Sequence, residues 1–218
     1  MDIESARKEA HPEEVPDSER LLAVLDDAVA AFRAADVTFL LMGGLATSVL
    51  GRERRITDID FFVRDPDVPA TLAALEEAGF ETIVVSPNWL AKGFKDGVLV
   101  DVLSRSTHDI TLTDDILERA VEVDVHGRVL RCVAPEDLIV MKAIATNEDT
   151  GRYWHDALSL MRREDLDWAY LVRRSKQHGA KRVLSLVFFA QSVDLLVPDH
   201  VVSELLEAVR PVGSRTDG

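Results

Sequence analysis

Two aspartates separated by one apolar residue are the part of the sequence best suited to chemistry. Asp58-Ile59-Asp60 opens an apolar run that continues to Val63. Because alternate side chains of a β-strand point to the same face, the two carboxylates are expected on one face and Ile59, Phe61 and Val63 on the other. Two carboxylates roughly 4 Å apart repel by about 4 kcal/mol at an effective dielectric near 20. The pair therefore predicts a shared proton or a bound cation, and close oxygen ligands suit Mg²⁺.

A glycine pair precedes these aspartates at the end of the apolar run 37–42. Gly43 and Gly44 lack a Cβ atom, which permits unusual dihedral angles and close approach of a ligand to the backbone. The helix expected over 45–50 would direct its N-terminal amides at an anion. Ser48 lies about one turn into that helix and is a candidate phosphate contact. The alternatives are a plain strand-to-helix turn for the glycines and a merely exposed serine.

A third carboxylate lies inside an apolar strand predicted over 98–103. Asp101 is flanked by valine on both sides, where a charge is costly unless it is paired or bound to a cation. Two other aspartates lie on or beside predicted strands. Asp96 precedes a glycine and looks like a turn residue, whereas Asp124 alternates with valines like Glu122, as on the exposed face of a strand. Of the three, Asp101 is the one whose position requires a partner or a cation.

The glycine pair and the aspartates together form a longer pattern. Met42-Gly43-Gly44, then 13 residues, then Asp58-Ile59-Asp60 resembles the signature of the DNA polymerase β-like nucleotidyltransferase superfamily. The resemblance implies transfer of a nucleoside monophosphate from a nucleoside triphosphate, such as ATP, to a hydroxyl group, with release of pyrophosphate. It also implies that Asp58, Asp60 and Asp101 bind catalytic Mg²⁺, with Mn²⁺ as a substitute, and that the glycines bind the nucleotide.

A lysine and an aspartate on later helices form a second motif. Lys142, followed by Arg152 and Asp156, resembles the C-terminal motif of minimal and abortive-infection-type toxin nucleotidyltransferases, although His155 stands where arginine or lysine is commoner. The resemblance implies that Lys142 binds the nucleotide phosphates and that catalytic Asp156 takes the proton of the attacking hydroxyl. In the alternative reading, Lys142 extends to solvent and Arg152 with Asp156 is an ordinary helix pair.

The acceptor stays open among an RNA end, a protein side chain and a small molecule. The toxin-like motif favours RNA or protein, and with it an antitoxin partner. The alternatives are an aminoglycoside or lincosamide nucleotidyltransferase and a non-catalytic, nucleotide-binding regulatory protein.

These residues must be positioned by an α+β fold, a small mixed sheet with flanking helices followed by a helical region. The expected organisation is a tail over 1–17, a nucleotidyltransferase core over 18–133, a helical region over 134–212 and a second tail over 213–218. The pattern predicts strands over 37–42, 58–63, 80–85, 89–94 and 98–103, a hairpin of 121–125 with 128–133, and helices over 18–35, 45–50, 66–78, from 135, and over 150–161, 165–177, 181–193 and 198–209.

Composition narrows the class of protein. The chain has 218 residues, a formal net charge of −14 and a single cysteine, Cys132. No apolar run is long enough for a membrane span, and the charged N-terminus is unlike a signal peptide. One cysteine suits a cytoplasmic protein. The negative charge excludes a broad basic nucleic-acid surface, although Arg52, Arg54 and Arg55 form a local cluster that is either a contact patch or a solvated face.

Overall fold

The computed structural model describes residues 17–210, so the tails predicted over 1–17 and 213–218 lie outside it except for Asp17. The chain forms two compact units that divide between Ala134 and Pro135. The first is a mixed sheet with flanking helices and the second is helical, which confirms the predicted α+β fold class.

The first unit contains every strand of the described chain. Asp17 caps its first helix by accepting a hydrogen bond from Arg20 N at 2.8 Å. In chain order the elements are α2 (Ser18–Ala34), β1 (Phe39–Met42), α3 (Gly43–Leu50), β2 (Asp58–Val63), η1 (Asp65–Asp67), α4 (Val68–Glu77), β3 (Glu81–Ser86), β4 (Leu90–Lys95), β5 (Val98–Leu103), β6 (Arg105–Ser106), η2 (Thr107–Asp109), β7 (Ile110–Thr111), α5 (Asp114–Arg119), β8 (Val121–Val125) and β9 (Arg128–Cys132).

The main sheet has seven strands in the order β3-β4-β5-β2-β1-β9-β8, and β6 with β7 forms a separate ribbon. The central strand β2 is antiparallel to β1 and parallel to β5. The register of β2 and β5 pairs Asp60 with Asp101. The register of β4 and β5 follows from a tight turn at Asp96 and Gly97, whose φ angles are 51° and 74°. The turn aspartate expected at position 96 is therefore confirmed.

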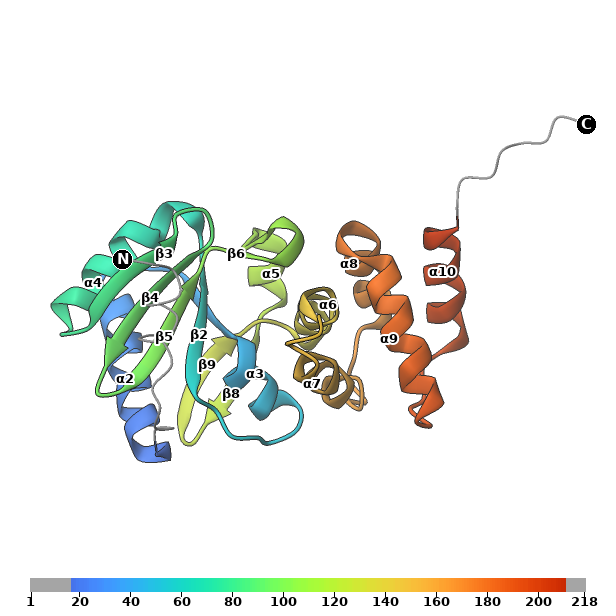
Figure 1. Ribbon diagram of the computed structural model, residues 1–218, viewed down its shortest axis with the longest axis horizontal. Helices are drawn as coiled ribbons and strands as arrows, with labels where there is room; N and C mark the ends of the chain where they lie inside the picture. Colours follow the sequence, from blue (N-terminus) through green and yellow to red (C-terminus); the bar gives the residue numbers. More distant parts are fainter. Residues whose placement is uncertain (1–16, 211–218) are drawn as a thin grey trace, which may run out of the picture. The chain divides into compact units, whose positions relative to one another are not determined.

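An aromatic cluster holds α2 against one face of the sheet. The rings of Phe32, Phe39 and Phe61 meet edge to face, with centroids 5.0 to 5.5 Å apart. Helices α2 and α4 lie next to each other on this side (Figure 1). Because Phe61 points into the cluster, Asp58 and Asp60 point to the opposite face, and they are half-buried while Ile59 and Phe61 are fully buried. The predicted alternation along β2 is confirmed.

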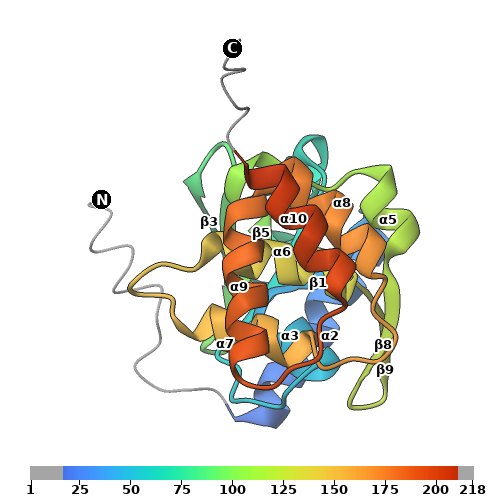
Figure 2. The ribbon, with the colours of Figure 1, turned by 90° about the vertical axis from the view of Figure 1, so that its right-hand side faces the viewer.

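The second unit consists of helices α6 (Pro135–Ala145), α7 (Arg152–Leu160), α8 (Trp168–His178), α9 (Ala180–Ser192) and α10 (Asp199–Val209). Helix α6 packs against α7, α8 and α9, and α10 packs against α8 and α9 (Figure 2). None of the helices between residues 17 and 210 is long and apolar enough to cross a membrane.

Buried charges in α6 are paired within the same unit. Asp137 accepts hydrogen bonds from Tyr170 Oη at 2.7 Å and from Arg174 Nε at 2.6 Å. Glu136 accepts one from Asp167 N at 2.7 Å. A buried charge is tolerated only with such partners, so these bonds join α6 to α8 and to the residue that precedes α8.

Candidate active site

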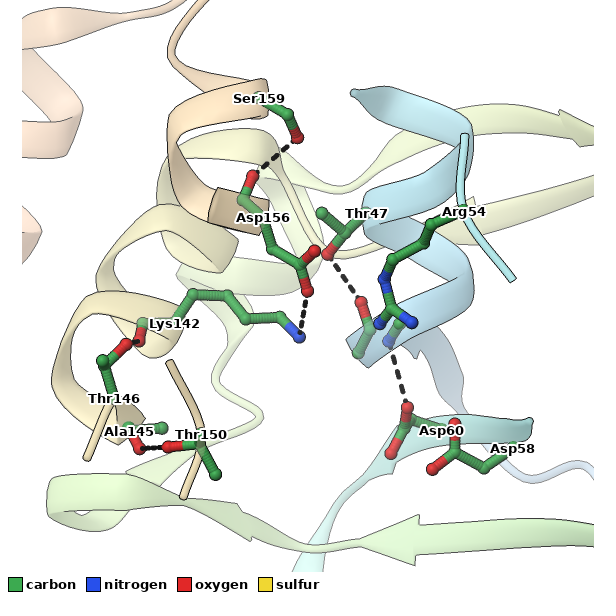
Figure 3. A network of polar contacts seen from close by, with 12 residues as sticks. Thr47, Arg54, Asp58, Asp60, Lys142, Ala145, Thr146, Thr150, Asp156 and Ser159 are labelled. Atoms are coloured by element: carbon green, nitrogen blue, oxygen red, sulfur yellow. Dashed lines mark hydrogen bonds and ion pairs between the residues drawn. The ribbon is translucent and has the colours of Figure 1, made fainter. Parts of the chain in front are cut away.

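The glycine turn comes first in the chain and lies directly beside an aspartate of β2. Helix α3 begins at Gly43 itself, two residues earlier than predicted. Gly43 has a φ of 67°, in the left-handed region, and a Cβ at this position would overlap the carboxylate of Asp60. Gly44 N donates a hydrogen bond to Asp60 Oδ2 at 3.2 Å (Figure 3). Only glycine at position 43 permits both the backbone conformation and the close approach.

The three aspartates predicted to bind metal lie on one face of the sheet. Asp58 and Asp60 alternate along β2, and Asp101 is the register partner of Asp60 on β5. The Thr57 hydroxyl lies 3.4 Å from Asp58 Oδ1. Among the described residues, however, no group of three or more histidine, cysteine, aspartate and glutamate side chains is gathered as a metal site would require. The sheet thus places the three carboxylates on one face, but they are not all close enough to share one metal ion in this structure.

Asp101 forms an ion pair with a lysine that the sequence analysis did not single out. Lys92, on β4, is the cross-strand partner of Asp101, and its Nζ lies 2.8 Å from Asp101 Oδ1. Their side chains are 13% and 14% exposed, so the pair is largely removed from water. A carboxylate inside an apolar strand was expected to be paired or bound to a cation, and Lys92 supplies the pair.

The donor chemistry of this sheet face suits a hard divalent cation. Asp58, Asp60 and Asp101 offer only carboxylate oxygens, which Mg²⁺ prefers in proteins. A cation bound at this face would compete with the Lys92 ammonium for the carboxylate of Asp101.

Ser48 contacts protein backbone in this structure. Its Oγ accepts a hydrogen bond from Arg54 N at 3.1 Å and lies 3.5 Å from Arg54 O, which ties α3 to the loop before β2. Arg54 is half-buried, with its guanidinium against Gly44, whereas Arg52 and Arg55 are exposed. The basic cluster seen in the sequence is therefore divided into one inward and two outward side chains.

The second motif forms a close pair within the helical unit. Lys142 Nζ lies 3.2 Å from Asp156 Oδ2, and the two side chains are 9% and 4% exposed (Figure 3). The ammonium also lies 4.2 Å from the centroid of the Tyr153 ring. The alternative in which Lys142 extends to solvent is therefore wrong. His155 is exposed, as expected of a residue that binds nothing directly.

Comparison with solved structures identifies proteins of similar fold. The solution structure of the antibiotic-resistance factor ANT(2'')-Ia has a TM-score of 0.52 at 14% identity and covers 82% of this chain and 96% of that one. The crystal structure of ANT(2'')-Ia with adenylyl-2''-tobramycin has a TM-score of 0.50 at 15% identity, covering 80% and 98%. The lincosamide antibiotic adenylyltransferase LnuA, with lincomycin bound, has a TM-score of 0.49 at 19% identity, covering 67% and 99%. At 14% and 15% identity, the two ANT(2'')-Ia structures show a shared fold only.

The family is identified by the sequence itself. Residues 3–192 match the model of a family described as uncharacterised nucleotidyltransferase. No curated protein matches the sequence. The match spans most of the chain, including the glycine turn, all three strand aspartates and the Lys142–Asp156 pair. The chain therefore belongs to this nucleotidyltransferase family and is an enzyme.

Proposed function

We propose that this enzyme transfers a nucleoside monophosphate from a nucleoside triphosphate to a hydroxyl group of RNA or protein in a Mg²⁺-dependent reaction. The observation that supports this most is the contact between the start of α3 and Asp60. The Gly44 amide and the Asp60 carboxylate are 3.2 Å apart. An anion at the helix start and a cation at the aspartates would therefore be direct neighbours, which is the arrangement that a metal-bound triphosphate needs.

The strand aspartates and the glycine turn have separate roles in this proposal. Asp58, Asp60 and Asp101 would hold one or two Mg²⁺ ions, for which Mn²⁺ can substitute. The metal supplies charge neutralisation for the triphosphate and acidifies the acceptor hydroxyl. Gly43 and Gly44 let the phosphates approach the backbone. The acceptor oxygen forms a bond to the α-phosphorus, the bond from that phosphorus to the bridging oxygen breaks, and pyrophosphate leaves.

Lys142 and Asp156 complete the proposal through the resemblance to toxin nucleotidyltransferases. Lys142 adds positive charge for the phosphates, and Asp156 accepts the proton that the hydroxyl loses. Their 3.2 Å separation supports a joint role, because it places the positive charge and the candidate proton acceptor side by side. An enzyme that modifies cellular RNA or protein in this way would be expected to have a neutralising antitoxin partner.

Labelling tests the acceptor class. The protein is incubated with Mg²⁺ and each of the four α-³²P-labelled nucleoside triphosphates, in separate reactions with total RNA, with lysate protein and with aminoglycosides or lincosamides. We expect label on RNA or protein, and none with Asp60→Asn as the matched control. Label on an antibiotic would instead support the alternative suggested by ANT(2'')-Ia, whose complex contains adenylyl-2''-tobramycin. Absence of pyrophosphate from every reaction would contradict the proposal and favour a nucleotide-binding regulatory protein.

A further inference from the structure

We infer that Arg54 binds the triphosphate of the nucleotide and that Ser48 positions it. The inference rests on the proposed function, since it concerns the same glycine turn. Arg52, Arg54 and Arg55 were treated as one basic cluster in the sequence, and the inference assigns the phosphate contact to Arg54 alone.

The position of the guanidinium is defined by its contact with Gly44. A Cβ added to Gly44 would lie 2.5 Å from Arg54 Nη2 and 3.4 Å from Cζ. The amide of the same glycine donates to Asp60 Oδ2. Figure 3 shows the Arg54 side chain extending over the start of α3 toward Asp60. The arginine therefore adds its charge at the point where the proposed phosphate-binding amides and the metal-binding face meet.

Local hydrogen bonds hold Arg54 in this orientation. Ser48 Oγ accepts from Arg54 N at 3.1 Å, which anchors the backbone of the loop to α3. Arg54 Nη1 donates to Arg55 O at 3.0 Å, which turns the guanidinium back along the loop. The serine hydroxyl thus acts on the arginine and not directly on phosphate.

Electrostatics explains why a fixed cation is needed here. A triphosphate must approach a sheet face that carries Asp58, Asp60 and Asp101, in a chain of net charge −14. Lys92 pairs with Asp101 in this structure. An arginine stays charged at every working pH, and its planar fork matches the geometry of phosphate oxygens. Arg54 therefore offsets the repulsion between the phosphates and the strand aspartates at the start of α3.

Gly44 provides an independent way to move the guanidinium. Unlike Gly43, Gly44 has no left-handed φ, so alanine is compatible with its backbone. The atom that a new Cβ meets is the end of the Arg54 side chain, which would have to shift. Gly44→Ala should therefore displace the Arg54 guanidinium, and because Gly44 also lets the phosphates approach the backbone, it should weaken triphosphate binding at least as much as Arg54→Gln.

The test measures equilibrium binding by calorimetry, with Mg²⁺, of the α,β-methylene analogues of ATP, GTP, CTP and UTP, which cannot transfer the nucleoside monophosphate. For the analogue that binds tightest to the wild type, we expect Arg54→Gln to weaken binding about tenfold and Ser48→Ala about threefold. Arg52→Gln and Arg55→Gln are matched controls on the same loop and should change binding less than about twofold. The corresponding monophosphate, which lacks the β- and γ-phosphates, should bind Arg54→Gln and the wild type alike.

Two results would overturn the inference in distinguishable ways. If the wild type binds an analogue and Arg54→Gln binds it within about twofold, Arg54 is not a phosphate ligand and the proposed function survives. If the wild type binds none of the four, the proposed function fails with it. Arg54→Lys keeps the charge and loses the planar guanidinium, so its affinity for the analogue should lie between those of the wild type and Arg54→Gln. It serves as the second variant if Arg54→Gln does not fold.

Discussion

Replacing Asp101 by asparagine should destabilise the metal-free protein, because the change leaves the Lys92 ammonium without its carboxylate. The two side chains lie 2.8 Å apart and are only 13% and 14% exposed. Exposed pairs contribute about 0–1 kcal/mol, whereas breaking a fully buried pair costs about 3–5 kcal/mol. Asparagine can still accept a hydrogen bond from the lysine, so we expect a loss of about 2 kcal/mol, between these limits.

The assay is thermal or urea unfolding in excess EDTA. A loss of about 2 kcal/mol corresponds to a fall in Tm of roughly 4–8 °C for a chain of this size. Lys92→Gln and the double variant complete a cycle, and we expect the double variant to recover part of the loss, with a coupling of about 1 kcal/mol or more. Asp124→Asn is the control, since Asp124 is exposed on β8.

The outcome discriminates between two roles for Asp101. If like-charge repulsion among the strand aspartates dominated, Asp101→Asn would leave the metal-free protein as stable as the wild type or more stable. That result, or a strictly additive cycle, would refute the view that Lys92 holds Asp101. A folded Asp101→Asn that retains full transferase activity would remove Asp101 from the proposed metal site altogether.

Three further changes probe other parts of the molecule. Mg²⁺ or Mn²⁺ should raise the Tm of the wild type by mass action but not that of Asp60→Asn, and an equal shift in both would exclude Asp60 as a ligand. Gly43→Ala should cost about 1–3 kcal/mol in urea unfolding, because φ is 67° and the Cβ overlaps Asp60. Burial raises the pKa of Glu136 despite the hydrogen bond from Asp167 N, so its stabilisation is present at acidic pH and is lost as pH rises through the folded-state pKa. Glu136→Gln should therefore raise Tm at pH 7.5 but not at pH 4, and a lower Tm at pH 7.5 would contradict this sign.

The fold was largely predictable because its elements have strong local patterns. Each strand of the main sheet was expected within about two residues of its observed bounds. The elements that were not expected are β6, β7 and α5, because β6 and β7 have only two residues each and the six residues of α5 make fewer than two helical turns. Thr113, whose hydroxyl accepts a hydrogen bond from Ile116 N and caps α5, was the available signal for that helix.

The sequence alone determined the features that depend on neighbours along the chain. The alternation of β2 placed Asp58 and Asp60 on one face, because side chains of a strand repeat every two residues whatever they pack against. Gly43 was likewise expected to permit an unusual dihedral angle and a close approach to the backbone, although the sequence did not show that its φ would be 67°.

Tertiary structure decided which charges meet. Lys92 pairs with Asp101, and Arg54 turns inward while Arg52 and Arg55 turn outward, because these contacts depend on strand register and loop anchoring and not on local spacing. The pairing of Lys92 with Asp101 could have been predicted from the sequence, since a two-residue Asp96-Gly97 turn fixes the register of β4 and β5. The 3.2 Å contact of Lys142 with Asp156 could not have been predicted, because it requires two helices to pack with one particular rotation, which no pattern along either helix specifies.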